Sequence, residues 1–342
     1  MDHNRWDTHR EACCRAIARQ RATLKILLKT KDDPFLLERW ILHHRKIVGS
    51  DNLVIFDNMS AHPDVIRVCD KYRDTIQIIR YPGFYDSLHD VAACPELYET
   101  LQDAARFFIF LDTDEFLILI DDDKYYDDEV LVDFLGDQDE SDALPTTWLP
   151  NMDWSATRFQ CGDDFNSIAS RIAWGKPILR SKAALSGFIN HNIQLDQSLF
   201  SKPFRMNFFV LHMKNLMPEQ RISSNVNKLR ARGYAAAGES AEAIGRRSLD
   251  GITDESTIRY VTEIRRLMAM TGHRQEDGPL GAGCLELLDD HRIRYYGEQE
   301  RAVLRALIDD PMPAFSRAVL RTRFVLHKKG QEGRLVRQNR QQ

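Results

Sequence analysis

The run Arg-Phe-Phe-Ile-Phe-Leu-Asp-Thr-Asp-Glu-Phe-Leu at residues 106–117 is the most informative stretch of the chain. Residues 107–111 are wholly apolar, as in a strand that is buried on both faces of a sheet. Asp112 and Asp114 follow directly. In the turn after a strand, two such carboxylates can converge on one hard cation, which bridges phosphate oxygens. The run therefore predicts a buried strand that ends in a metal site. The alternative is an acidic helix N-terminus that Asp112 caps.

Apolar segments alternate with helix-like segments upstream of this run. Strands that alternate with helices in this way make a mostly parallel sheet, so the sequence predicts the α/β class. The expected strands lie at residues 24–28, 52–56, 75–79 and 106–111. The expected helices lie at residues 34–47, 63–72 and 95–105.

The pattern changes in the second half of the chain. Residues 143–149, 176–180 and 207–213 look like strands, and the chain turns helical from residue 217. We therefore predict a mostly parallel central sheet with a helical C-terminal extension. The expected parts are an N-terminal extension at 1–22, a main α/β domain at 23–215, and a helical region with a basic tail at 216–342.

Basic residues dominate the last stretch of the chain. Between Arg321 and Arg340 only Glu332 is acidic, against seven lysines and arginines. A solvated tail is the simpler interpretation of such a run. Contact with anionic lipid or with a partner is the alternative.

The overall composition narrows the classes of function. The chain has 342 residues and a formal net charge of -4, so it has no global basic field and nucleic acid is not an expected partner. The start does not resemble a secretory signal and no apolar run is long enough to span a bilayer. A cytoplasmic location is therefore expected, and peripheral membrane contact through the basic tail is the alternative to a solvated tail. The six cysteines have no C-x-x-C spacing, which argues against a zinc cluster or a dense disulfide framework.

The residues that follow the apolar runs form a candidate ligand-binding rim. In parallel sheets, ligands lie beyond the carboxyl ends of the strands. The side chains at these positions combine carboxylates, which need a cation, with bases that suit phosphate. They are Thr30, Lys31, Asp32, Asp33, Asp57, Asn58, Arg80, Asp112 and Asp114.

Three motifs occur in order along the first half of the chain. They are Thr-Lys-Asp-Asp-Pro-Phe-Leu-Leu-Glu-Arg-Trp-Ile-Leu-His-His at 30–44, Val-Ile-Phe-Asp-Asn-Met-Ser at 54–60, and Phe-Leu-Asp-Thr-Asp-Glu-Phe-Leu at 110–117. Together they resemble the family-two-like glycosyltransferases, in the branch written N-E-x-x-x-L-x-E-W-x-x-x-H, Y-D-N-x-S and D-x-D-E-F. The resemblance covers about residues 24–215. It implies a GT-A fold, a nucleotide-sugar donor, Mn²⁺ or Mg²⁺, and inversion at the anomeric carbon.

The resemblance also assigns roles to single residues. Asp57 matches the acid that contacts the nucleotide base or ribose, with Asn58 beside it, although from the residues alone Asp57 could simply form a turn. The family's Asn-Glu is replaced here by Asp32 and Asp33, which leaves open which of the two takes the glutamate's place. Lys176 lies in a matching basic strand, where it could approach phosphate or be a surface base.

A third metal ligand is implied next to Asp112 and Asp114. His212, in the segment Phe-Val-Leu-His-Met at 209–213, matches the family's late L-H-x segment. Imidazole binds Mn²⁺ better than Mg²⁺, so His212 as a ligand would favour Mn²⁺. The alternative is a histidine that closes a strand with a backbone hydrogen bond.

An inverting transfer also needs a general base near the acceptor hydroxyl. The candidates are Asp153, Asp163, Asp164, His191 and Asp196. We favour Asp153, because it follows a strand-like segment and its neighbour Trp154 could stack on a sugar ring. Asp114 and Asp153 are thus the predicted catalytic residues.

The predicted function is metal-dependent transfer of a sugar to a glycan or lipid-linked acceptor, as in polysaccharide biosynthesis. One alternative is a haloacid-dehalogenase-like phosphatase, whose D-x-D follows the first strand of its core. Here the motif follows the fourth expected strand and continues with Glu115 and Phe116. The other alternative is a catalytically inactive GT-A-like protein that only binds.

Overall fold

The computed structural model describes residues 4–83, 85–138, 142–152, 156–161, 165–200, 206–236, 238–270, 284–318 and 322. A six-stranded sheet lies at its centre, with the strand order β3-β2-β1-β4-β10-β7. The first four of these strands run parallel, and β10 and β7 complete the sheet as antiparallel neighbours. The strands are β1 (Ala22–Thr30), β2 (Leu53–Asp57), β3 (Gln77–Arg80), β4 (Ala105–Leu111), β7 (Ala143–Pro145) and β10 (Pro177–Arg180).

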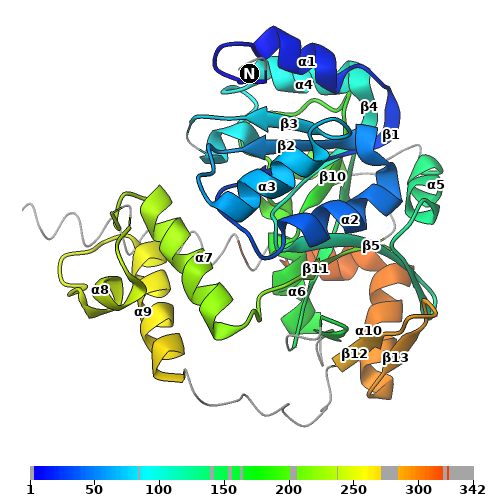
Figure 1. Ribbon diagram of the computed structural model, residues 1–342. Coiled ribbons are helices and arrows are strands. Elements are labelled where there is room, and N and C mark those ends of the chain that lie inside the picture. The colour runs from blue at the N-terminus through cyan, green and yellow to red at the C-terminus, as the bar shows by residue number, and fades with distance from the viewer. Residues whose placement is uncertain are drawn as a thin grey trace, which may run out of the picture.

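Helices cover both faces of this sheet (Figure 1). In α2, buried apolar side chains recur every three or four residues from Leu37 to Ile47, and Gly49 ends the helix with a φ of 76°. One layer holds α2 (Leu37–Val48) and α3 (Pro63–Tyr72), and the other holds α1 (Arg10–Ile17) and α4 (Pro95–Ala104). The alternation of strands and helices confirms the predicted α/β class with a mostly parallel central sheet.

The N-terminal segment packs against the edge of the sheet at β3. Arg80 accepts a backbone hydrogen bond from Trp6 and donates one to Asn4, and the Trp6 side chain is buried. The predicted N-terminal extension thus contributes to the core.

A second sheet continues directly from the Asp112–Asp114 turn. Its order is β6-β5-β11-β8, and β5 begins at Glu115. The interpretation of the turn as a helix N-terminus is therefore wrong, because the residues after it extend into a strand. The strands are β5 (Glu115–Asp121), β6 (Lys124–Tyr126), β8 (Thr147–Pro150) and β11 (Phe208–His212).

The expected strand at 143–149 is two strands. The extended segment is interrupted at Thr146. Before this residue β7 joins the central sheet, and after it β8 joins the second sheet. Both halves are mostly buried, and the local pattern of apolar residues therefore does not reveal the change of sheet. Two further helices lie along this half of the chain, α5 (Val130–Gly136) and α6 (Phe165–Trp174). The short 3-10 turns are η1 (Ser50–Asn52), η2 (Tyr85–His89), η3 (Asn192–Gln194) and η4 (Gln197–Phe200).

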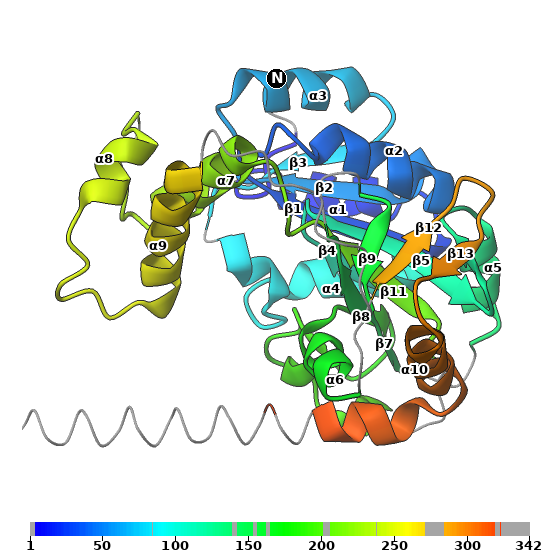
Figure 2. The same cartoon turned by 90° about the horizontal axis from the view of Figure 1, so that it is seen from below.

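The C-terminal region has two parts. The helices α7 (Pro218–Ala231), α8 (Ala241–Arg246) and α9 (Glu255–Met270) enclose a small core of their own, built on Leu229, Ile244 and Val261. Figure 2 shows α8 and α9 to one side of the sheets. By contrast, α10 (Glu298–Asp309) packs Leu304 and Leu307 into the main core.

The C-terminal region also contains two strands that the sequence did not predict. The strands β12 (Cys284–Leu287) and β13 (Ile293–Tyr295) form a hairpin that pairs with β9 (Arg158–Gln160). Strands this short are not stable by themselves, and the pairing of the hairpin with β9 stabilises all three strands. The proposed boundary at residue 215 stays a prediction. Within the described ranges, no helix is both long and apolar enough to cross a membrane.

Candidate functional site

The parallel strands bring the predicted rim residues together. Thr30 on β1 is in register with Asp57 on β2, and Asp57 is in register with Arg80 on β3. Thr113, in the turn after β4, donates a hydrogen bond from its hydroxyl to the Thr30 hydroxyl at 3.3 Å. The carboxyl ends of four neighbouring strands therefore meet at one edge, as the sequence predicts.

Asp57 takes part in a turn and in an ion pair at the end of β2. Its carboxylate accepts a hydrogen bond from the Ser60 backbone N–H at 3.1 Å, which is the turn-forming role. It also lies 2.7 Å from the half-exposed guanidinium of Arg80. Next to it, the Asn58 side chain donates to the Gly83 carbonyl at 2.9 Å and shapes the loop. A contact of Asp57 with a nucleotide stays a prediction.

Asp32 and Asp33 have different surroundings. The Asp32 carboxylate accepts hydrogen bonds from the backbone N–H groups of Ala61 and His62, at 2.7 and 2.8 Å, so it fixes the loop before α3. Asp33 lies nearer to the motif. Burial, and then the negative charge of Asp114, raise the pKa of Asp33 above its usual value. Asp33 is thus the one that faces the Asp112–Asp114 turn, and Lys31 lies half-buried on the same loop.

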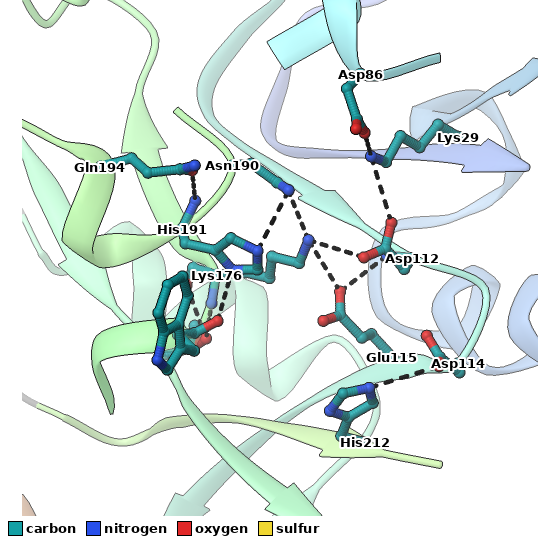
Figure 3. Close-up of polar contacts among 12 residues, drawn as sticks. Lys29, Asp86, Asp112, Asp114, Glu115, Lys176, Asn190, His191, Gln194 and His212 are labelled. Atoms are coloured by element: carbon teal, nitrogen blue, oxygen red, sulfur yellow. Dashed lines mark hydrogen bonds and ion pairs between the residues drawn. The ribbon is translucent and has the colours of Figure 1, made fainter. Parts of the chain in front are cut away.

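Asp112 is held between two lysines (Figure 3). Lys176 Nζ donates to Asp112 Oδ2 at 3.0 Å, and Lys29 Nζ lies 3.9 Å from Asp112 Oδ1. Lys29 also donates to Asp86 Oδ1 at 2.5 Å. Burial alone would raise the pKa of Asp112, but Lys176 and Lys29 outweigh it and hold the pKa well below the usual range. Asp112 is therefore ionised.

Glu115 lies beneath Asp112 and is almost fully buried. Its Oε2 accepts the Asp112 backbone N–H at 2.8 Å and lies 3.6 Å from Lys176 Nζ. Burial, reinforced by the charges of Asp112 and Asp114, raises the pKa of Glu115, although Lys176 opposes the shift. Among the described residues, its Oε1 has no hydrogen-bond partner.

Asp114 faces His212 across the two strands of the second sheet. The pairing of β5 with β11 sets His212 opposite Glu115, and His212 Nε2 lies 3.5 Å from Asp114 Oδ2. Burial would raise the pKa of Asp114, but His212 and then Lys228 lower it to about 2. The imidazole of His212 therefore faces a carboxylate. The His212 carbonyl also accepts the Asn151 backbone N–H at 3.1 Å at the end of β11, so both interpretations of this histidine stay open.

The donor set around Asp114 fits a divalent cation. Two ligands that share one ion at about 2.1 Å are roughly 3 to 3.5 Å apart, which matches Asp114 Oδ2 and His212 Nε2. His212 Nδ1 is buried and has no partner in the described part of the chain. No group of three histidine, cysteine or acidic residues is assembled around one point within that part. Asp112 Oδ2 lies against Lys176, so the Oδ1 atom is the one that could join.

The predicted general base lies outside the described residues. The same is true of Asp163, Asp164 and the basic tail, except for Thr322. His191 is described, and both of its ring nitrogens are engaged, by the Trp174 carbonyl at 2.6 Å and the Asn190 amide at 3.3 Å. Burial lowers the pKa of His191 to about 3. Asp196 accepts the backbone N–H of Ser198 at 2.9 Å, which is typical of a turn.

Sequence reasoning missed three residues next to the motif. Asp86 pairs with Lys29, and Asn190 accepts a hydrogen bond from Lys176 Nζ at 2.6 Å. His89 is fully buried, and burial followed by the charge of Lys29 lowers its pKa well below the usual value. Asp86 and His89 lie in the short 3-10 turn η2 and Asn190 lies in a loop, so no periodic pattern in the sequence singled them out.

Comparisons with known proteins give a likeness to solved structures only. No family model and no curated protein matches the chain. It is similar to TarS 1-349 from S. aureus, with 11% identity, a TM-score of 0.31, and coverage of 74% of this chain and 73% of that chain. It is also similar to the mannosyltransferase PcManGT from Pyrobaculum calidifontis in complex with GDP-Man and Mn²⁺, with 13% identity, a TM-score of 0.33, and coverage of 75% and 77%.

A third similar structure is glucosyl-3-phosphoglycerate synthase from Mycobacterium tuberculosis, in complex with Mn²⁺, UDP-glucose and phosphoglyceric acid. It shares 13% identity with a TM-score of 0.31, and the match covers 66% of this chain and 84% of that chain. At such identities and TM-scores the likeness concerns the course of the chain alone. The function is therefore argued from the site.

Proposed function

We propose that the chain is a metal-dependent glycosyltransferase, which moves a sugar from a nucleotide-sugar donor to a glycan or lipid-linked acceptor with inversion. The observation that carries the proposal is the pair of Asp114 and His212, 3.5 Å apart, beside Asp112 at the carboxyl ends of the parallel strands. This edge is where α/β sheets bind ligands. A carboxylate and an imidazole that face each other there suit Mn²⁺.

The residues of the site have separate proposed roles. Asp114, His212 and Asp112 Oδ1 would hold the metal, which when bound neutralises charge on the diphosphate leaving group. Asp57, at the end of β2, and Arg80, at the end of β3, would contact the nucleotide. Asp153 stays the proposed base that accepts the proton of the acceptor hydroxyl. The identity of the acceptor, and membrane contact through the basic tail, likewise stay predictions from the sequence.

The test is the Asp114→Ala variant. We expect it to lose at least about 100-fold in metal-dependent turnover of nucleotide-sugars, because the metal loses a ligand, while the circular dichroism spectrum stays that of the wild type. The assay measures hydrolysis of a nucleotide-sugar panel with Mn²⁺ and with EDTA. Asp103→Ala, at an exposed position of α4, is the matched control and should keep wild-type activity.

Three results would overturn the proposal. Full activity of folded Asp114→Ala protein would remove Asp114 from the metal site. Hydrolysis of a generic phosphomonoester in place of nucleotide-sugars would favour the phosphatase alternative. Turnover of neither substrate class by the wild type would leave the chain as a binding protein.

A further inference from the structure

Lys176 is the most deeply buried cation of the site. Its side chain is 0% exposed, although the residue lies beside the ligand-binding edge. The Nζ atom donates to Asp112 Oδ2 at 3.0 Å and to Asn190 Oδ1 at 2.6 Å, and lies 3.6 Å from Glu115 Oε2 (Figure 3). An ammonium group has three N–H donors. Two of them are used by Asp112 and Asn190, and Glu115 Oε2 lies just beyond hydrogen-bond distance, so the ammonium group is surrounded by oxygen atoms of the protein.

The backbone at Lys176 is held as firmly as its side chain. Its N–H donates to Thr146 Oγ1 at 3.1 Å, and its carbonyl accepts from the same hydroxyl at 2.7 Å. A Cβ atom on Gly175 would lie 2.0 Å from the Thr146 carbonyl oxygen, so only glycine allows this approach. Lys176 thus reaches Asp112 from a fixed origin.

Asp112 receives two independent restraints from this cluster. Lys176 binds its carboxylate at Oδ2, and Glu115 accepts its backbone N–H. The Oδ1 atom is left on the side of Lys29, 3.9 Å from that ammonium group. Rotation of the carboxylate would break the Lys176 contact inside a buried environment, where an unpaired charge is strongly unfavourable.

We infer that Lys176 is a positioning residue, which acts through Asp112 by fixing the carboxylate with Oδ1 toward the ligand. This rests on the proposed function, and it replaces the sequence-based expectation that Lys176 contacts phosphate. The inference separates two effects of removing the ammonium group. A positioning residue affects the chemical step and only while Asp112 is present, whereas a phosphate ligand affects nucleotide binding in either background.

The experiment is a double-mutant cycle of Lys176→Met with Asp112→Asn. We expect Lys176→Met to lower kcat for nucleotide-sugar hydrolysis by about 100-fold, and to change it by less than about threefold in the Asp112→Asn background, since the two residues act as a unit. Binding of UDP and of GDP in EDTA should change by less than about twofold. Equal fold-losses in both backgrounds, or loss of nucleotide binding on Lys176→Met alone, would overturn the inference.

A matched control separates positioning from plain stability. Lys25 is 1% exposed on β1, and its Nζ donates to Asn52 Oδ1 at 3.1 Å and to the Asp51 carbonyl, away from the site. Lys25→Met should lower the urea midpoint of unfolding but leave kcat unchanged. A fall in kcat as large as that of Lys176→Met would mean that loss of any buried lysine has this effect, and would refute the assignment.

The cycle also distinguishes failure of the inference from failure of the proposed function. If the wild type hydrolyses no nucleotide-sugar, the proposed function fails. The urea midpoints of the same four proteins then decide on Lys176. Non-additive shifts support the coupling of Lys176 to Asp112, and additive shifts contradict it.

Discussion

At the scale of single residues, the two carboxylates of the motif are not equivalent. Asp112 is paired with lysines, at 3.0 Å from Lys176 and 3.9 Å from Lys29. Asp114 instead faces an imidazole at 3.5 Å. The aspartates share a turn, but the side chains that neutralise them come from different parts of the chain. Asp112 is therefore part of an ionic cluster with the two lysines. Asp114, by contrast, could bind the same metal ion as the nitrogen donor His212.

This difference leads to a prediction about metal preference. His212→Ala should weaken Mn²⁺ binding about tenfold or more and Mg²⁺ binding much less, because an imidazole nitrogen binds Mn²⁺ better than Mg²⁺. Calorimetric titration of each ion into the wild type and the variant measures the effect. His9→Ala, next to α1, is the control and should bind both ions as the wild type does. An unchanged ratio of Mn²⁺ to Mg²⁺ affinity in His212→Ala would show that the histidine is not a ligand.

At the scale of elements, the site depends on the break between β7 and β8. Thr146 lies at this break, and its hydroxyl makes two hydrogen bonds to the backbone of Lys176. The Asn192 side chain also donates to the Thr146 carbonyl, at 3.0 Å. The position of Lys176 in the candidate site is thus tied to a point where the chain leaves one sheet for the other.

Gly175→Ala tests this dependence. The added Cβ would meet the Thr146 carbonyl oxygen at 2.0 Å, so the backbone must shift. We expect a loss of about 1 to 3 kcal/mol in the free energy of unfolding, as for overpacked cores, together with lower activity. Gly136→Ala is the matched control, because nothing lies within 4 Å of its added Cβ. Urea denaturation compares the two variants, and equal stabilities would argue against the close contact at Gly175.

At the scale of the whole molecule, buried neutral histidines couple stability to pH. Burial lowers the pKa of His43 to about 4, and that of His44 and His89 well below the usual value. Both ring nitrogens of His44 are engaged inside the core. Nδ1 donates to the Trp40 carbonyl at 2.9 Å, and Nε2 accepts the Leu117 backbone N–H at 3.1 Å. Protonation of any of the three in the folded protein would therefore lower the free energy of unfolding.

The resulting prediction is a loss of stability in mild acid. The unfolded chain binds these protons near the free-histidine pKa of about 6.5, while the folded chain does not. Stability is therefore fully present above about pH 6.5 and falls as the pH drops toward 4, by up to about 1.4 kcal/mol per pH unit for each histidine. Urea unfolding at pH 7, 6 and 5 measures this slope.

His89→Phe isolates one of these contributions. Within the described residues neither ring nitrogen of His89 has a hydrogen-bond partner, and the ring packs 4.8 Å from that of Phe110. The variant should keep the packing and lower the pH slope by about one proton. A slope equal to that of the wild type would mean that His89 is charged in the folded protein.

The alternation of apolar and polar residues determined much of this protein on its own. Strand and helix periods depend only on near neighbours, so the four parallel strands, α2, α3 and the late strand at β11 could all be predicted from local pattern. The order of the strands then placed Thr30, Asp57, Arg80 and Asp112 at one edge, because parallel strands end on the same side of a sheet. The predicted metal site and base, by contrast, are still to be tested.

Only the tertiary structure decided which charges meet. Lys176 lies 64 positions from Asp112, Asn190 lies in a loop, and Asp86 lies in the short 3-10 turn η2. Likewise, the pairing of β11 with β5 decided that His212 faces Asp114, and the pairing of β12 with β9 added strands that the sequence did not predict. Such pairings depend on how distant segments pack. A local sequence pattern specifies which face of an element is buried, but not which other element covers it.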